Sequence, residues 1–355
     1  MKIHNYSAGP CILPPEVMRK ASEAVIEFEG TGLSLLEMSH RSKEFVAVME
    51  RARSLVKEVL NVPAGYEVLF LQGGASLGFY ISALNYMKQN GKGAYVNTGT
   101  WASNAIKEAK LVGEVDVIAS SEDRGFSYIP KNFNIPSDVD YFHFTSNNTI
   151  FGTQFKSIPK SPVPMICDMS SDIFSREINV ADYAMIYAGA QKNLGPAGTT
   201  VYIVNTEMLG KTGRDLPSML NLQKHIDKES MFNTPPVFSV YVSMLTLEWM
   251  KGLGGVAAIE KLNQIKAQTL YAEIDNNPLF EGKTAVEDRS NMNVTFDLKN
   301  EDHRPAFDEL WKAAGISGLK GHRSVGGYRA SMYNALPIES VKVLVETMQE
   351  LPNKI

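Results

Sequence analysis

Cysteine is scarce in this sequence of 355 residues, which contains only Cys11 and Cys167. Two isolated cysteines give neither the C-x-x-C spacing of a metal site nor the framework of a disulfide-stabilised fold, so we expect no metal site. Low cysteine usage is also typical of proteins in a reducing compartment.

Long hydrophobic runs are missing as well. No stretch of about 18 consecutive apolar residues occurs, so we expect no membrane-spanning helix. Residues 1–6 lack the apolar core of a signal peptide, and with the few cysteines this predicts a cytoplasmic protein. The net charge of −4 and the pI near 5.9 argue against a nucleic-acid-binding protein, which would more often be basic.

Short strand-like segments alternate with helical ones in the first part of the sequence. Apolar residues recur at helical spacing in residues 17–28, 43–60, 77–87 and 101–109. Strand-like apolar runs occur at residues 66–71, 93–96, 115–119, 141–145, 165–168, 184–187 and 200–204. This alternation predicts an α/β domain with a mainly parallel sheet.

The pattern changes after about residue 221. Helical spacing continues at residues 237–250, from 257 onward, at 304–314 and at 338–351, with strand-like runs at 293–298 and 329–333. This mixture predicts a smaller α+β domain, and a chain of this length is expected to hold about two domains of roughly 150 residues. We expect a large domain of residues 15–257 and a small domain of residues 258–355 together with 1–14.

Lys192 has an unusual setting for a lysine. It follows an apolar run and lies among glycine, alanine and proline in residues 188–198, which would let a flat ligand approach the backbone. A lysine amine beside a cofactor aldehyde can form a Schiff base and later carry protons. Taken alone, a lysine is more often a solvated surface charge.

Asp168 ends the strand-like run at residues 165–168, where a side chain would point into the usual ligand crevice of an α/β sheet. A pyridoxal ring needs such an acid to keep its pyridine nitrogen protonated. For Asp168 alone, a helix cap or a turn residue is an equally good interpretation. Asp168 and Lys192 on successive strands of one sheet form a more specific pattern than either residue.

Residues 73–76, Gly-Gly-Ala-Ser, connect a strand to a helix, and free N–H groups at a helix N-terminus bind phosphate. The segment matches neither the Walker nor the G-x-G-x-x-G motif, so nucleotide binding loses support. A segment of this composition more often forms an ordinary turn than a phosphate-binding site. Trp101 begins the next helix, where its indole could stack on a flat ring or simply fill the core.

Nine motifs extend these signals in a fixed order. The motifs are Ser7-Ala8-Gly9-Pro10, Met38-Ser39-His40-Arg41, Gln72-Gly73-Gly74-Ala75-Ser76, Gly99-Thr100-Trp101, Asn148-Thr149-Ile150, Asp168-Met169-Ser170-Ser171, Gly189-Ala190-Gln191-Lys192-Asn193, Asn233-Thr234-Pro235-Pro236 and residues 321–331. With these motifs, the sequence resembles the phosphoserine aminotransferase family, which consists of class-V pyridoxal-phosphate enzymes of fold type I. The likeness runs from residue 7 to about residue 335.

The resemblance implies a role for each candidate residue toward pyridoxal 5′-phosphate. Lys192 would hold the cofactor covalently, Asp168 would pair with the pyridine nitrogen, and Trp101 would stack on the ring with Thr149 beside it. The phosphate contacts would be Ala75, Ser76 and Gln191 in one subunit, with Asn233 and Thr234 from the other subunit of a homodimer. Some family members carry arginine where Ser76 stands, so backbone and hydroxyl groups would hold the phosphate here.

The resemblance also implies a reaction, which converts 3-phosphohydroxypyruvate and glutamate into O-phosphoserine and 2-oxoglutarate in serine biosynthesis. Bacterial family members also act on 4-phosphohydroxythreonine in pyridoxine biosynthesis. Both substrates of such an enzyme carry two anionic ends, which suit the planar fork of arginine. Arg329 is implied at the α-carboxylate, and the residues implied around the distal anion are His40, Arg41, His322 and Arg323. Any one of these arginines could instead form a surface ion pair.

Three other functions share parts of this pattern. A cysteine desulfurase needs a nucleophilic cysteine, whereas Cys11 and Cys167 are better interpreted as small buried hydrophobes. An alanine–glyoxylate or serine–pyruvate aminotransferase has substrates without a distal phosphate, so it would not need the pairs His40-Arg41 and His322-Arg323. A non-catalytic pyridoxal-phosphate carrier would need no anion-binding groups around an amino-acid site.

Overall fold

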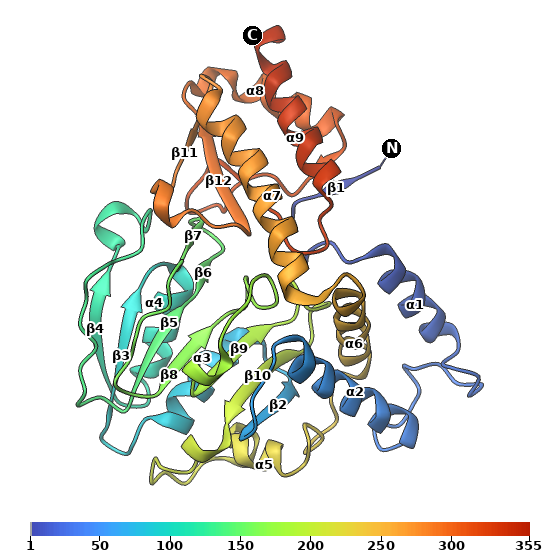
Figure 1. Cartoon of the computed structure of the whole chain (residues 1–355), viewed down its shortest axis with the longest axis vertical. Helices are drawn as coiled ribbons and strands as arrows, with labels where there is room; N and C mark the ends of the chain where they lie inside the picture. Colours follow the sequence, from blue (N-terminus) through green and yellow to red (C-terminus); the bar gives the residue numbers. More distant parts are fainter. Residues whose placement is uncertain (1) are drawn as a thin grey trace.

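A seven-stranded sheet forms the centre of the larger of two lobes in the computed structural model, which describes residues 2–355 and leaves Met1 outside (Figure 1). Six strands are parallel, and only β10 runs antiparallel to both of its neighbours. The strand order is β2 (Tyr66–Leu71), β10 (Thr200–Asn205), β9 (Met185–Gly189), β8 (Met165–Asp168), β5 (Tyr141–Thr145), β3 (Lys92–Asn97) and β4 (Glu114–Ser120).

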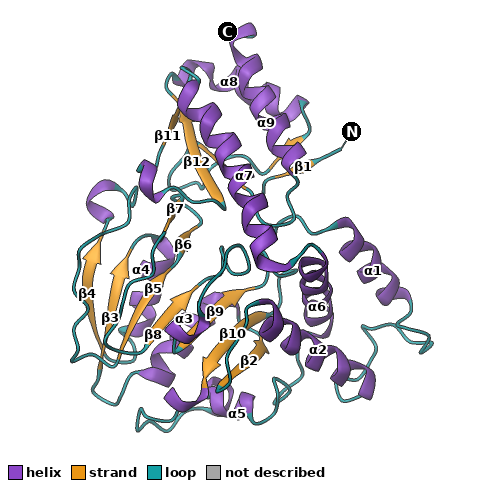
Figure 2. Cartoon of the chain, in the orientation of Figure 1, coloured by secondary structure: helices purple, strands orange, loops and turns teal. Residues whose placement is uncertain are grey.

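Helices cover both faces of this sheet, as Figure 2 shows. Successive strand residues point to opposite faces, so Phe142 and Phe144 pack into one hydrophobic cluster and Tyr141 into another. The first cluster includes α1 (Pro15–Ile26), α2 (Lys43–Val59) and α6 (Val237–Gly252). The second includes α3 (Gly74–Tyr86), α4 (Thr100–Ala109) and α5 (Leu222–Ile226).

The smaller lobe has an antiparallel sheet and a hydrophobic core of its own. Its sheet order is β11 (Phe280–Gly282), β12 (Asn293–Leu298) and β14 (Tyr328–Ser331). Against it lie α8 (Arg304–Ala313) and α9 (Ile338–Glu350), and the short strand β1 (His4–Asn5) pairs in parallel with β13 (Ile316–Ser317). The buried Tyr6 belongs to this core, so the N-terminal segment packs with the end of the chain.

The long helix α7 (Gly255–Asn276) joins the lobes (Figure 1). Its residues Val256 and Ile259 pack in the first cluster of the large lobe, whereas Ala267 and Leu270 pack in the small one. Two separate cores support the proposed division into residues 15–257 and 258–355 with 1–14. The proposed boundary falls in the first turn of a continuous helix, because α7 serves both cores.

Most expected elements occur, and the differences have local causes. The strands expected at residues 66–71, 141–145, 165–168 and 293–298 have the observed bounds. Helix α3 begins at Gly74 rather than at residue 77, because Gly73 adopts a left-handed conformation with φ of 96° and acts as its N-cap. The strand expected at 184–187 is β9, one residue later at its start and two residues longer at its end.

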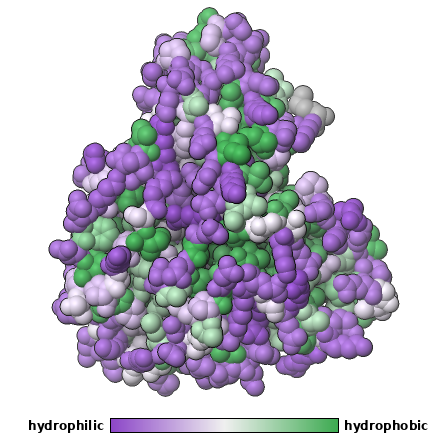
Figure 3. Space-filling view, in the orientation of Figure 1, coloured by the Kyte–Doolittle hydropathy of each residue, from purple (hydrophilic) through white to green (hydrophobic). Residues whose placement is uncertain are grey.

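Polar side chains cover most of the face shown in Figure 3, and apolar ones gather toward the junction of the lobes. Within residues 2–355, no helix combines the length and the apolar composition needed to cross a bilayer. Several large apolar side chains on or after α1 are nevertheless exposed, namely Met18, Ile26, Leu33 and Leu36.

Candidate active site

A cavity of about 310 Å³ lies at the carboxyl ends of the central strands. Thr145 ends β5, Asp168 ends β8, and Lys192 follows the end of β9. This is the edge of an open α/β sheet at which ligands usually bind. The cavity brings together most of the residues expected from the sequence: Ala75, Ser76, Trp101, Thr149, Asp168, Gln191, Lys192, His322 and Arg329.

The amine of Lys192 is held in this cavity by one hydrogen bond, because Nζ donates to Thr149 Oγ1 at 2.8 Å. Burial lowers the pKa of Lys192 to about 8, and the charge of Arg329 adds to this lowering while that of Asp168 opposes it. A lysine with this pKa is partly neutral near pH 8 and can act as a nucleophile or a base.

Gly9 lies close to the side chain of Lys192. A Cβ added at Gly9 would lie 3.3 Å from Lys192 Cγ, and its φ of 134° is one that other residues rarely adopt. The N-terminal segment can therefore approach the lysine only with glycine at this position.

Asp168 is buried, and its carboxylate is held by Ser170. Asp168 Oδ1 accepts hydrogen bonds from Ser170 N at 2.9 Å and from Ser170 Oγ at 2.6 Å. Burial raises the pKa of Asp168, while these hydrogen bonds and the charge of Lys192 act in the opposite direction. Ser170 thus favours the charged carboxylate, and a protonated ring nitrogen beside it would offset the cost of its burial.

The N-terminus of α3 forms another wall of the cavity. Ala75 and Ser76 lie in its first turn, and no side chain caps this end of the helix. The first N–H groups of a helix lack partners within the helix and favour an anion. This wall is therefore suited to a phosphate group.

Three buried polar atoms of the cavity wall have no hydrogen-bond partner within residues 2–355: Trp101 Nε1, Thr145 Oγ1 and Arg329 Nε. Buried polar groups are normally paired, so such atoms indicate a missing ligand. Arg329 is fixed by donating from Nη1 to Thr149 O at 3.3 Å, and His322 Nδ1 lies 2.7 Å from Ser324 Oγ. The small lobe thus supplies the guanidinium of Arg329 and the imidazole of His322, whose pKa is lowered by burial and by the charges of Arg329 and Arg323, to the cavity.

Comparisons with known proteins agree with this geometry. The family profile described as aminotransferase class-V matches residues 3–344. The phosphoserine aminotransferase of Flavobacterium psychrophilum is 65% identical over 356 residues, and the match covers both chains completely. The chain belongs to the class-V aminotransferase family.

Solved structures show the same relationship. A phosphoserine aminotransferase structure that records radiation damage of its Schiff base has a TM-score of 0.97 and 44% identity, and the match covers 100% of this chain and 99% of the other. The pyridoxal-phosphate-bound phosphoserine aminotransferase of Trichomonas vaginalis has a TM-score of 0.92 and 34% identity, with coverage of 98% and 100%. The fold is therefore that of fold-type I pyridoxal-phosphate transferases.

Class-V aminotransferases use pyridoxal phosphate, and the residues of this cavity fit it. The uncapped N-terminus of α3 suits the phosphate, Asp168 suits the ring nitrogen, and the partly neutral amine of Lys192 suits the aldehyde. The unpartnered Trp101 Nε1 and Thr145 Oγ1 offer further polar contacts.

Five residues expected at the site of a class-V aminotransferase do not line this cavity: His40, Arg41, Asn233, Thr234 and Arg323. His40 and Arg41 precede α2, and Arg41 is exposed. Thr234 O accepts a hydrogen bond from Gln72 Nε2 at 2.6 Å, whereas Asn233 Oδ1 has no partner in the described part of the chain. Their roles stay predictions.

The cavity also includes residues to which the sequence analysis gave no role. Ser170 follows Asp168 by two positions, a spacing at which a serine often bonds an aspartate, so this contact could have been expected. Asn147 lines the cavity and donates to Ser171 Oγ at 2.8 Å. Its position follows from the short hairpin of β6 (Asn147–Asn148) and β7 (Thr153–Gln154), for which the sequence carries no clear signal.

Proposed function

We propose that this protein is a phosphoserine aminotransferase, which transfers the amino group of glutamate to 3-phosphohydroxypyruvate in serine biosynthesis. The observation that carries this proposal is a single cavity that holds Lys192 and Asp168 between two anion-binding walls. One wall is the N-terminus of α3, and the other includes Arg329 and His322. The full-length identity of 65% to a phosphoserine aminotransferase supports the choice of substrate.

Different residues of the chain have separate roles in this reaction. Bound pyridoxal phosphate supplies an aldehyde that joins amines and a ring that accepts electrons. Lys192 Nζ, oriented by Thr149 Oγ1, would take the proton from the Cα of the donor amino acid and would give a proton to the Cα of the product amino acid. The Asp168 carboxylate holds the proton of the ring nitrogen, and Ser170 keeps that carboxylate in place.

Substrate binding is assigned to the cationic groups. We place the α-carboxylate at Arg329, whose buried Nε has no partner in residues 2–355. The distal phosphate or carboxylate would meet His322 together with Arg323, His40 and Arg41. The same groups would accept 4-phosphohydroxythreonine, so a second reaction in pyridoxine biosynthesis belongs to this proposal.

Rival functions fit the site less well. Cys167 is buried in β8, and burial raises the pKa of its thiol well above the usual range. Burial also raises the pKa of Cys11 to about 12, and its Sγ donates to Lys192 O at 2.7 Å. Neither thiol is suited to the nucleophilic role that a desulfurase requires.

We also propose that the enzyme works as a homodimer in the cytoplasm. Asn233 and Thr234 would reach the cofactor phosphate of the other subunit, and the unpartnered Asn233 Oδ1 supports such a contact. The side chains of Ile26, Leu33 and Leu36 are exposed, and large apolar side chains of this kind are typical of surfaces that a partner covers. Sedimentation analysis that found only monomers at micromolar concentration would contradict the homodimer.

A coupled assay tests the main proposal. Purified protein supplied with pyridoxal phosphate should form more than one equivalent of 2-oxoglutarate from glutamate only when 3-phosphohydroxypyruvate is present to accept the amino group. Lys192→Ala should abolish this turnover and the yellow colour of the bound cofactor. Preference for alanine with glyoxylate would favour the alanine–glyoxylate type, and the absence of any turnover would favour a carrier.

A further inference from the structure

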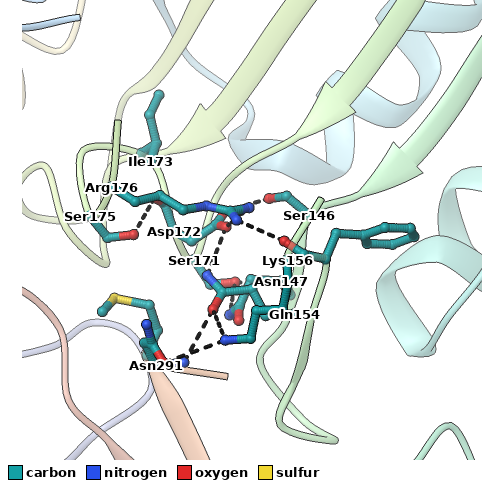
Figure 4. Close-up of polar contacts among 12 residues, drawn as sticks. Ser146, Asn147, Gln154, Lys156, Ser171, Asp172, Ile173, Ser175, Arg176 and Asn291 are labelled. Atoms are coloured by element: carbon teal, nitrogen blue, oxygen red, sulfur yellow. Dashed lines mark hydrogen bonds and ion pairs between the residues drawn. The ribbon is translucent and has the colours of Figure 1, made fainter. Parts of the chain in front are cut away.

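A buried ion pair joins Asp172 and Arg176, in the segment that follows Asp168 in the sequence (Figure 4). Arg176 Nη2 donates to Asp172 Oδ2 at 3.0 Å, and the side chains are 17% and 1% exposed. Arg176 Nη1 also donates to Phe155 O at 2.7 Å. The Asp172 carboxylate accepts two further hydrogen bonds, from Ser146 Oγ and from Gln154 Nε2. Neither member of the pair lines the cavity, so the pair does not contact the substrate.

The same carboxylate is joined to the backbone of Asp168. Ser146, whose hydroxyl donates to Asp172, also donates from its backbone N to Asp168 O at 3.0 Å, and its Oγ lies 3.2 Å from the same oxygen. At the other end of the turn, Ser171 Oγ donates to Asn147 O at 2.8 Å. The turn is therefore fixed to the neighbouring strand on both sides of Ser170, which holds the Asp168 carboxylate.

The pair also sets the charge that Asp168 experiences. The negative charge of Asp172 is close enough to raise the pKa of Asp168, in addition to the larger effect of burial. Arg176 is the cationic partner of this carboxylate. Removing the arginine would leave a second negative charge beside Asp168 uncompensated, and a proton would then move more readily onto Asp168.

We propose that the Asp172–Arg176 pair is a positioning element: Asp172 fixes the turn that aims the Asp168 carboxylate at the cofactor ring, and Arg176 compensates the charge of Asp172 so that Asp168 stays ionised. This inference rests on the proposed function, because it concerns the same cofactor site. Asp172 and Arg176 act through Asp168, so they position the catalytic groups without joining the reaction.

The experiment is a double-variant cycle on the cofactor-loaded protein, with Arg176→Gln, Asp172→Asn and both changes together. Two quantities are measured: the dissociation constant of pyridoxal phosphate, and the ¹⁵N NMR shift of the labelled ring nitrogen, which reports whether that nitrogen is protonated. Arg176→Lys is the conservative variant. The matched control is Arg53→Gln, because Arg53 is 13% exposed and likewise donates to a carbonyl, Val68 O, and to a carboxylate, Glu67 Oε2; it also forms an ion pair with the exposed Glu229 at 3.4 Å.

Arg176→Gln should weaken cofactor binding roughly tenfold and shift the ring nitrogen toward its unprotonated signal. Arg176→Lys should keep the dissociation constant of the cofactor and the ring-nitrogen shift close to their wild-type values. The double variant should show the wild-type nitrogen shift, because it has no uncompensated charge at position 172. Should Arg176→Gln fail to fold, the lysine and double variants still decide the matter by their nitrogen signals.

The inference is overturned if Arg176→Gln lowers thermal stability as Arg53→Gln does but leaves the nitrogen signal at its wild-type position. A nitrogen shift in the double variant as large as in Arg176→Gln would also overturn it. Failure of the proposed function is a separate result, since wild-type protein would then bind no cofactor or show no turnover.

Discussion

The amine of Lys192 has a pKa of about 8, well below the ordinary value of 10.5, chiefly because it is buried. The neutral amine is the form that attacks an aldehyde, so its fraction rises as the pH increases through this pKa. We predict that apoprotein captures pyridoxal phosphate faster from pH 7 to pH 9, with a midpoint near 8. Stopped-flow absorbance measures this rate.

A neighbouring charge provides the control for this prediction. Arg329 contributes to lowering the pKa of Lys192, so Arg329→Met should move the midpoint to higher pH. A capture rate that does not change across this pH range would contradict the assignment of Lys192 as the reacting amine.

Arg41 is exposed, unlike the buried Lys192, and its predicted role is to bind the distal anion of the substrate. If Arg41 binds the distal anion, Arg41→Ala should raise KM for the phosphorylated substrate about tenfold or more, because a charge-assisted contact contributes roughly 1.5–3 kcal/mol. The absorbance of the bound cofactor should not change. Arg19→Ala, on the exposed face of α1, serves as the control. Loss of the cofactor absorbance in Arg41→Ala would show that the residue acts elsewhere.

Among the elements, the loop between β13 and β14 is sterically tight where it precedes His322. A Cβ added at Gly321 would overlap the backbone oxygen of Gly326. We predict that Gly321→Ala displaces His322 and lowers kcat/KM for the phosphorylated substrate at least about tenfold, a loss of roughly 1.4 kcal/mol in transition-state binding. Cofactor affinity should stay the same, because the wall formed by α3 is not disturbed.

Gly252→Ala is the matched control for this loop, since nothing lies within 4 Å of its added Cβ. Equal kinetics for Gly321→Ala and Gly252→Ala would mean that the loop adapts and that His322 is not held by its backbone. Steady-state measurements on both variants decide this.

The sequence predicts correctly those elements in which the order of apolar residues reflects which residues are buried. Strands β5 and β8 are fully buried and were expected at their observed bounds, because short apolar runs between turns are typical of central strands. The direction of β10 could not be predicted, since a fully buried strand has the same apolar pattern in either orientation. Strand β1 has two residues, and its pairing with β13 depends on tertiary packing.

The same reasoning applies to the site. Asp168 and Lys192 could be expected together because parallel strands end at one edge of a sheet. The contacts of Asn147 with Asn293 and of Asp172 with Ser146 and Gln154 could not, because they join segments that only the tertiary fold brings together. Asn233 and Arg41 lie outside the cavity of a single chain, so no pattern within this chain tests them.

At the scale of the whole molecule, the helix that joins the lobes carries a buried lysine. Lys266 in α7 is 2% exposed and donates to Met332 O and Tyr333 O at 3.1 and 2.8 Å. Burial lowers its pKa to about 7. Between this value and the ordinary value of 10.5, the unfolded chain binds the additional proton, so the unfolding free energy should rise with pH.

We predict that Lys266→Met removes this contribution, which amounts to at most about 1.4 kcal/mol per pH unit. The melting temperature of the wild type should gain more between pH 7.5 and pH 9 than that of the variant, as measured by calorimetry. Lys261→Met, an exposed position on the same helix, should behave like the wild type. An identical pH dependence for the wild type and Lys266→Met would contradict the prediction.

Strand β1 and the residues after it have a consequence for how the enzyme is made. His4 Nδ1 lies 2.8 Å from Ser340 Oγ, which is 336 residues further along the chain. At a synthesis rate of about 5–20 residues per second, Ser340 is added roughly 20–70 s after His4. Ala8 and Gly9, which form part of the cavity, therefore leave the ribosome long before His322 and Arg329, which line the same cavity. A nascent chain can complete its cofactor site only after the small-lobe residues have been synthesised.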